Sequence, residues 1–133
     1  MIKKITLGIT LFFSTMFASP AYADWVKIGT IQGDTTYVDF DRIRTNGSYV
    51  YYWQLIDLLE PDGDGDLSYK TYHQGDCEIF RLKGFSGISY KQPMGEGSVG
   101  EINSPPDPKW IYVPPKSSVE GILKQVCAVA ENL

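Results

Sequence analysis

Short runs of β-branched, aromatic and other apolar residues recur along the chain, each ended by turn-forming residues. Runs of this length and composition are typical of β-strands. Residues 25–31 and 35–39 are two such runs, and the Gln-Gly-Asp sequence between them predicts a tight turn, so we expect a hairpin. Residues 48–59 follow the turn signal Asn46-Gly47 and are mostly apolar on both alternating faces. This pattern predicts a central strand that is covered on both sides.

The second half of the chain has a weaker strand pattern that is interrupted by loops. Residues 60–66 are rich in Asp and Gly and predict a loop. Residues 93–108 are rich in Pro and Gly and predict a long surface loop, either irregular throughout or holding one short edge strand. The remaining segments predict strands at 67–73, at 77–82 with a continuation through 83–90, and at 110–113, with a turn or bulge at 74–76.

The end of the chain has the pattern of one amphipathic helix. Ser117 and Glu120 are spaced as in a capping box, in which each side chain satisfies a backbone amide at the start of the helix. Together with the predicted strands, this helix indicates an α+β fold: a largely antiparallel sheet with one C-terminal helix packed on one face. The apolar residues of the helix recur at helical spacing and form one stripe: Val119, Ile122, Leu123, Val126, Cys127 and Ala130.

Residues 1–23 have the layout of a secretory signal peptide. Lys3 and Lys4 precede an apolar run, and Ala21 and Ala23 are small residues at the two positions that signal peptidase reads before the cleavage site. An uncleaved membrane anchor is the alternative, but the run is shorter than the ~20 apolar residues that a spanning helix needs. No Cys follows the run to carry a lipid. We therefore expect cleavage after Ala23, export, and a single mature domain at 24–133 without a membrane span.

The charge of this domain argues against two classes of partner. The full chain has a net charge of −4, and removal of the two lysines of the signal peptide makes the mature charge about −6. Proteins that bind nucleic acids carry a basic patch or a basic excess, so a nucleic-acid partner is not expected. The acidic balance also gives no support for docking on anionic lipid.

Cys77 and Cys127 are the only two cysteines. In an exported chain, two cysteines indicate one disulfide. A catalytic thiol would need a nearby base, and the chain has one His. A metal site would need more ligands than two separate cysteines supply. Because Cys127 lies on the apolar stripe, a bond to Cys77 would tie the helix to the sheet.

The sharpest cluster of metal-ligating residues is Asp62-x-Asp64-x-Asp66. Alternating carboxylates separated by glycines resemble the opening of a calcium-binding loop. That motif continues with Gly after the third acid and Glu at its twelfth position, whereas Leu67 and His73 stand at these places. A solvated acidic turn is therefore the favoured interpretation, with calcium binding as the alternative, and we expect neither a metal nor another cofactor.

No complete catalytic motif is present in the sequence. A Ser-His-Asp triad or a Cys-His pair would have to use His73 as its base, and no serine lies in a GxSxG sequence. We expect a partly exposed strand histidine and a protein that is not an enzyme. The many aromatic residues are expected mainly to fill the core. A binding face, if there is one, is expected at Tyr49–Trp53 and in the 93–108 loop.

The order of several residues resembles the surface-adhesin protein E family of Gram-negative bacteria. The matching positions span most of the chain after the signal peptide. They are Trp25, Tyr37-Val38-Asp39, the aromatic strand ending near Trp53, Ser68, Cys77, Arg81, Trp110, Pro114-Pro115, the following serine pair and Cys127.

This resemblance implies a compact antiparallel sheet tied to a C-terminal helix by the disulfide. It also implies binding of host extracellular-matrix and serum proteins such as vitronectin and laminin, at the surface of a Gram-negative cell. The leading hypothesis is an exported, non-enzymatic protein-binding domain of this type, with host extracellular-matrix or envelope proteins as its partners. The alternative is a structural or accessory protein in the periplasm that has the fold and no host ligand.

Overall fold

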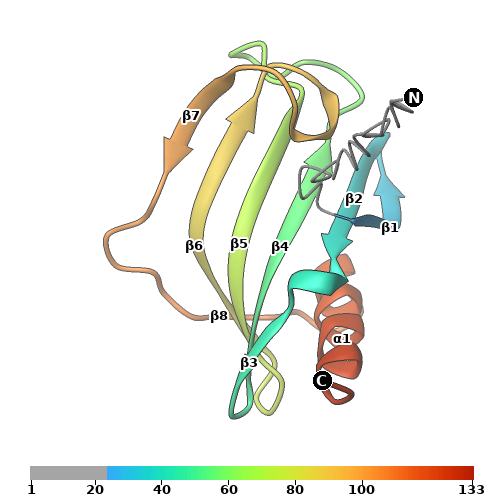
Figure 1. Ribbon diagram of the computed structural model, residues 1–133, viewed down its shortest axis with the longest axis vertical. Helices are drawn as coiled ribbons and strands as arrows, with labels where there is room; N and C mark the ends of the chain where they lie inside the picture. The colour runs from blue at the N-terminus through green and yellow to red at the C-terminus, as the bar shows by residue number, and fades with distance from the viewer. Residues whose placement is uncertain (1–23) are drawn as a thin grey trace, which may run out of the picture.

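The computed structural model describes residues 24–133, so the predicted signal peptide lies outside the described residues. All strand pairs are antiparallel, and the strands form one sheet in the order β1-β2-β4-β5-β6-β7, with β3 paired to β4 and β8 paired to β6 (Figure 1). The strands are β1 (Trp25–Ile31), β2 (Asp34–Asp39), β3 (Arg44–Asn46), β4 (Tyr49–Asp57), β5 (Ser68–Asp76), β6 (Arg81–Tyr90), β7 (Val99–Asn103) and β8 (Ile111–Tyr112). The helices are α1 (Ser118–Ala130) and the 3-10 turns η1 (Phe40–Arg42) and η2 (Pro93–Gly95).

The predicted α+β architecture is confirmed. The first two strands form the expected hairpin, and α1 is the helix expected at the end of the chain. The helix lies beside the lower ends of β2 and β4, away from β6 and β7 (Figure 1). The 93–108 segment contains η2 and the short edge strand β7, which is the second of the two arrangements expected for it.

The hydrophobic core lies between α1 and one face of the sheet. Leu123 and Val126 of the helix are fully buried against strand residues that include Val50 and Tyr52. Gly75 on β5 makes this close approach possible, because a Cβ atom at that position would lie 2.5 Å from the Cδ1 atom of Leu123. Glycine is therefore needed here for packing.

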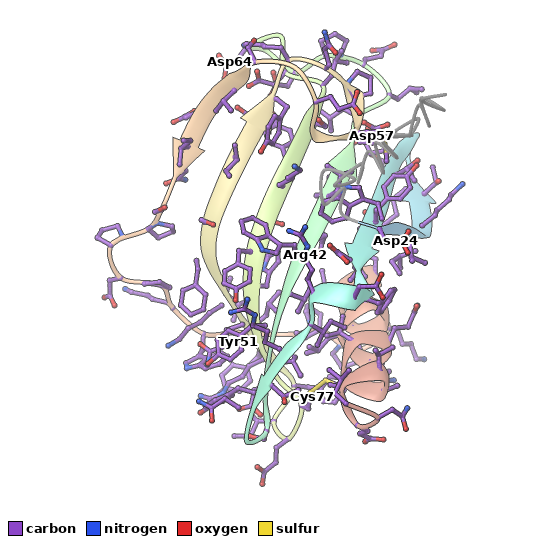
Figure 2. All side chains as sticks on the ribbon, viewed as in Figure 1. Asp24, Arg42, Tyr51, Asp57, Asp64 and Cys77 are labelled. Carbon is purple, nitrogen blue, oxygen red and sulfur yellow. A yellow bond between two sulfur atoms is a disulfide. The ribbon has the colours of Figure 1, made fainter. Side chains whose placement is uncertain are left out.

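A disulfide joins Cys77 to Cys127 with a Cα–Cα distance of 5.8 Å, and ties the C-terminal half of α1 to the sheet (Figure 2). Cys77 itself was expected in a strand, and this detail is wrong. It begins the turn between β5 and β6, because the Asp76 side chain accepts hydrogen bonds from the backbone amides of Glu78 and Ile79 and starts the turn. The Arg81 side chain donates to the same carboxylate and closes the turn.

The expected cover on both sides of β4 holds only toward the end of the strand, where Leu55, on the same side as Tyr51 and Trp53, is fully buried. The helix covers the Val50 and Tyr52 side of the strand, and Tyr51 and Trp53 on the other side stay half-buried. Tyr52 is the one aromatic residue of the described chain that belongs to the buried core, so the expectation that most aromatics fill the core fails as well. Aromatic side chains with polar groups tolerate partial exposure, so an apolar pattern on a strand need not mean full cover.

The start of α1 gives a first testable prediction. The Ser117 side chain accepts a hydrogen bond from the Glu120 backbone amide at 3.1 Å, as the capping pattern predicts. The substitution Ser117→Ala removes this acceptor and is expected to lower the free energy of unfolding by about 1 kcal/mol. Urea unfolding of both proteins measures the difference. Replacement by Asp, another strong capping residue, should retain most of the stability; an equal loss with Asp would contradict the capping role.

Candidate binding surface

The sheet face opposite α1, called here the open face, is lined with aromatic rings. Directly paired residues in an antiparallel sheet share a face, and Trp53 pairs with Tyr72 while Tyr51 pairs with Gln74. The Trp53 and Tyr72 ring centroids are 4.8 Å apart, and the Tyr51 ring lies parallel to Phe85 at 6.4 Å. Phe85 reaches this face because a β-bulge in β6 interrupts the alternation near Gly84. The rings form a continuous platform across β4, β5 and β6.

All three tryptophans of the chain belong to this face. Trp25 pairs with Asp39, the last residue of β2. The Lys70 Nζ lies 6.0 Å from the centroid of the Trp25 ring. Trp110 stacks on Tyr49 at 5.6 Å, beyond the other end of the platform. The open face is therefore aromatic from β1 to the segment before β8.

Positive charge collects on the same face, although the whole chain is acidic. Two of the cations are paired with buried carboxylates: Arg42 with Asp39 at 3.4 Å, and Arg81 with Asp76 at 2.9 Å. Figure 2 shows Arg42 lying over the middle of the sheet. Strand register and ring contacts place here six of the ten Lys and Arg side chains that the structure describes: Lys27, Arg42, Arg44, Lys70, Arg81 and Lys83.

The pKa values of the two buried carboxylates of the open face are shifted in opposite directions. Burial raises the pKa of Asp39, and the nearby Arg42 opposes this rise only in part. Burial also acts to raise the pKa of Asp76, but hydrogen bonds from Arg81 and two backbone amides lower it below its usual value. Asp76 is thus held as an anion that fixes Arg81 on the face.

Two neighbouring hollows lie in the open face, with volumes of about 490 and 250 Å³. Both are lined by Arg42 and Trp53, so they form one elongated depression. Arg44 and Tyr72 line the larger hollow, and Lys70 lines the smaller one beside Trp25 and Tyr90. Ligand sites in proteins are concave and combine aromatic walls with a few charged groups, and this depression has both features.

The predicted acidic cluster is brought together by the fold. One oxygen from each of Asp62, Asp64 and Asp66 lies within 4.8 Å of the others. The Asp62 side chain accepts hydrogen bonds from the backbone amides of Asp64 and Asp66, and so closes the loop on itself. Lys91 places its Nζ 2.8 Å from Asp66 Oδ1 and 2.9 Å from the carbonyl oxygen of Asp64. The ammonium group already balances charge that a metal ion would otherwise balance.

Calcium is therefore expected to have little effect on this protein. Addition of millimolar Ca²⁺ should leave the melting temperature unchanged within error, because Lys91 competes for the same oxygens and few further ligands are present. Thermal unfolding with Ca²⁺ and with Mg²⁺ as the control measures this. A rise specific to Ca²⁺ and lost in Asp64→Ala would establish the alternative, a calcium site.

His73 lies on the covered side of the sheet and not on the open face. Its ring stacks on Tyr52 with centroids 5.4 Å apart, and its Nε2 is 2.8 Å from the Thr71 hydroxyl. Burial lowers the pKa of His73 to about 4, because the core disfavours the charged imidazolium. The residue is a strand histidine as expected, and its neighbours are those of a core residue.

This histidine predicts a loss of stability in acid. The unfolded chain binds a proton near pH 6.5, whereas the folded chain binds it only near pH 4. As the pH falls through this window, the free energy of unfolding should decrease by about 3 kcal/mol from this group alone. Urea unfolding at a series of pH values measures it. The variant His73→Gln should show a much flatter profile between pH 6.5 and 4; an equal slope would contradict the assignment.

The expected binding segments are partly on the open face. Tyr49, Tyr51 and Trp53 belong to it, and η2 of the 93–108 segment borders it, since the Met94 amide donates to Asp57 at the end of β4. The cations of the open face were not predicted from the sequence. The period-two alternation of β5 could have placed Lys70 and Tyr72 together, but no sequence pattern places Arg42 or Arg44 beside them.

Comparison with known proteins shows the family of this chain. A sequence profile described as surface-adhesin protein E matches residues 25–128. The chain belongs to the surface-adhesin protein E family. Membership places it among exported or cell-surface proteins. Among the described residues, no helix is long and apolar enough to cross a membrane.

Solved structures of protein E from Haemophilus influenzae share the fold. One is similar with a TM-score of 0.57 at 14% identity, covering 82% of this chain and 97% of the other. A second crystal form gives a TM-score of 0.56 at 16% identity, with 77% and 96% coverage. Protein E from a non-typeable strain gives 0.54 at 16% identity, with 77% and 75% coverage. A comparison with curated protein sequences found no significant match.

Proposed function

We propose that this protein is a non-enzymatic adhesin domain that binds a macromolecular ligand of the host through the open face. The observation that carries the proposal is the gathering of all three tryptophans and six of the ten described Lys and Arg side chains on one sheet face that α1 leaves uncovered. Family membership supports adhesion as the role. Host matrix and serum proteins are the proposed ligands, because the resemblance to this family implies them.

Two properties of the open face favour binding over a purely structural role. Tyr, Trp and Arg dominate the energetics of protein interfaces, and they are the residues that line the depression. The side chains are also held before a ligand arrives, since Trp53 packs on Tyr72 and Tyr51 accepts a hydrogen bond from Gln74 at 3.1 Å. Binding would then cost little side-chain ordering.

Capture of immobilised host matrix proteins tests this proposal. The exported protein is passed at micromolar concentration over laminin and vitronectin surfaces, together with Trp53→Ala and a control, Leu59→Ala, at an exposed apolar residue outside the open face. We expect capture by the wild type and the control, and at least tenfold weaker capture by Trp53→Ala. Capture by none of the proteins, or equal capture by all three, would contradict the proposal.

The periplasmic accessory role would give a different result. In that case, the protein remains inside intact cells and captures no host protein, whereas an adhesin is found on intact cells or in the medium. Protease treatment of intact cells, with an internal periplasmic marker as the control, separates the two locations.

A further inference from the structure

We propose that the ligand of the open face is an acidic polysaccharide of the sulfated glycosaminoglycan class, so that the sugar chains carried by matrix components are bound directly. This inference rests on the proposed function and narrows it. The juxtaposition that carries it is an aromatic platform with cations placed between the rings, on a protein that is otherwise acidic.

The aromatic platform offers flat surfaces on which sugar rings can stack. One face of a pyranose ring presents C–H groups and is apolar, and such a face stacks on flat aromatic side chains. The tilted Trp53–Tyr72 pair lines the larger hollow, and Trp25 and Tyr90 line the smaller one. A linear sugar chain that follows the depression would meet an aromatic ring in each hollow.

Cationic side chains of the open face offer partners for the acidic groups of the sugar. Arg44 and Lys70 form no ion pair with another described residue, and each lines one of the two hollows. Lys83 lies 4.5 Å from the Trp110 ring centroid, farther along the same face. Sulfate and carboxylate groups accept strong hydrogen bonds from Arg and Lys, and Arg in particular offers a planar fork to such groups.

The placement of the acidic side chains also favours a polyanion as the ligand of the open face. Strand register and the hollows place four acidic side chains on the open face, namely Asp39, Asp41, Asp57 and Asp76, and two of these are paired with arginines. The densest acidic group is the Asp62–Asp66 loop, which lies outside this face. A polyanion is therefore repelled by most of the surface and attracted to this face, which orients it on approach.

The backbone of the open face favours a sugar over an acidic peptide. Peptides commonly gain affinity by adding a strand to a free sheet edge, which supplies main-chain hydrogen bonds. The floor of the depression is formed by β4, β5 and β6, whose backbone groups are already paired with their neighbours. A sugar chain needs only ring faces and charged side chains, and both are present.

Calorimetric titration of the exported protein with a heparin decasaccharide tests the inference. We expect saturable one-site binding that weakens steeply as the salt concentration rises, as for other polyanions that release counterions. Arg44→Ala and Lys70→Ala should each weaken binding by roughly tenfold. Lys124→Ala, which removes an exposed cation from α1 on the other side of the sheet, should leave it unchanged. Unchanged melting temperatures in all variants show that folding is intact.

Three results would overturn the inference. These are no binding of the decasaccharide at millimolar concentration, equal affinity for a glutamate decapeptide, and a loss of affinity in Lys124→Ala as large as in the open-face variants. The proposed adhesin function is judged separately by capture of laminin and vitronectin stripped of glycans. Capture that survives stripping and is lost in Trp53→Ala retains the function and rejects the sugar; absence of all capture rejects both.

Discussion

Replacement of both cysteines, in the double variant Cys77→Ser and Cys127→Ser, is expected to lower the free energy of unfolding by about 4 kcal/mol. The bond joins residues 50 positions apart, so the unfolded chain regains the freedom of a long loop when the bond is absent. It also anchors the C-terminal half of α1, whose buried residues complete the core. Domains of this size are stable by only about 5–15 kcal/mol, so the loss is large.

Urea unfolding of the double variant and of the wild type, with and without reductant, measures this effect. Reduced wild type should behave like the double variant, because both lack the same covalent link. The double variant is preferred to single ones, since each single variant leaves a free thiol. Equal unfolding midpoints for oxidised wild type and the double variant would show that the bond does not hold α1 on the sheet.

The substitution Val126→Asp is expected to reduce the free energy of unfolding by at least about 4 kcal/mol. Val126 has no exposed surface and packs in the layer between α1 and the sheet. A carboxylate there loses its hydration, and the surrounding residues Val38, Val50 and Leu123 offer no side-chain hydrogen bond. The same substitution also deletes apolar contacts.

Gln125→Asp is the matched control, because it adds the same charge to the neighbouring, exposed residue of the same helix. Circular dichroism during thermal unfolding compares the two variants with the wild type. We expect a change of at most about 0.5 kcal/mol in the control. A similar melting temperature for Val126→Asp and the wild type would contradict the packing of α1 described above.

The elements with strong local signals were predictable from the sequence. The capping box and the apolar stripe gave the helix, whose observed start follows Ser117 as expected. The β-branched and aromatic runs gave the first hairpin and the long strand β4. The Cys77–Cys127 bond followed from export and from the number of cysteines. In each case, the feature is determined by a short stretch of the sequence or by the number of cysteines.

The remaining features depend on contacts between distant segments. The strand β5 continues to Asp76, beyond the expected end at His73, because it is paired along its whole length with β4 and β6. The open face was missed because local patterns cannot say which face of a strand a single helix will cover. Its cations come from β1, η1, β3, β5 and β6, and only the sheet register brings them together.

The most direct test of the open face as the binding surface uses the three tryptophan indole groups. Each Nε1–H gives a separate resonance in a ¹H–¹⁵N spectrum, and Trp25, Trp53 and Trp110 all lie on this face. On titration with the heparin decasaccharide, we expect the indole signals to shift together, with Trp53 shifting most. The amides of exposed helix residues such as Gly121 and Lys124 should stay in place. Shifts confined to α1 amides, with all three indole signals unmoved, would contradict the account.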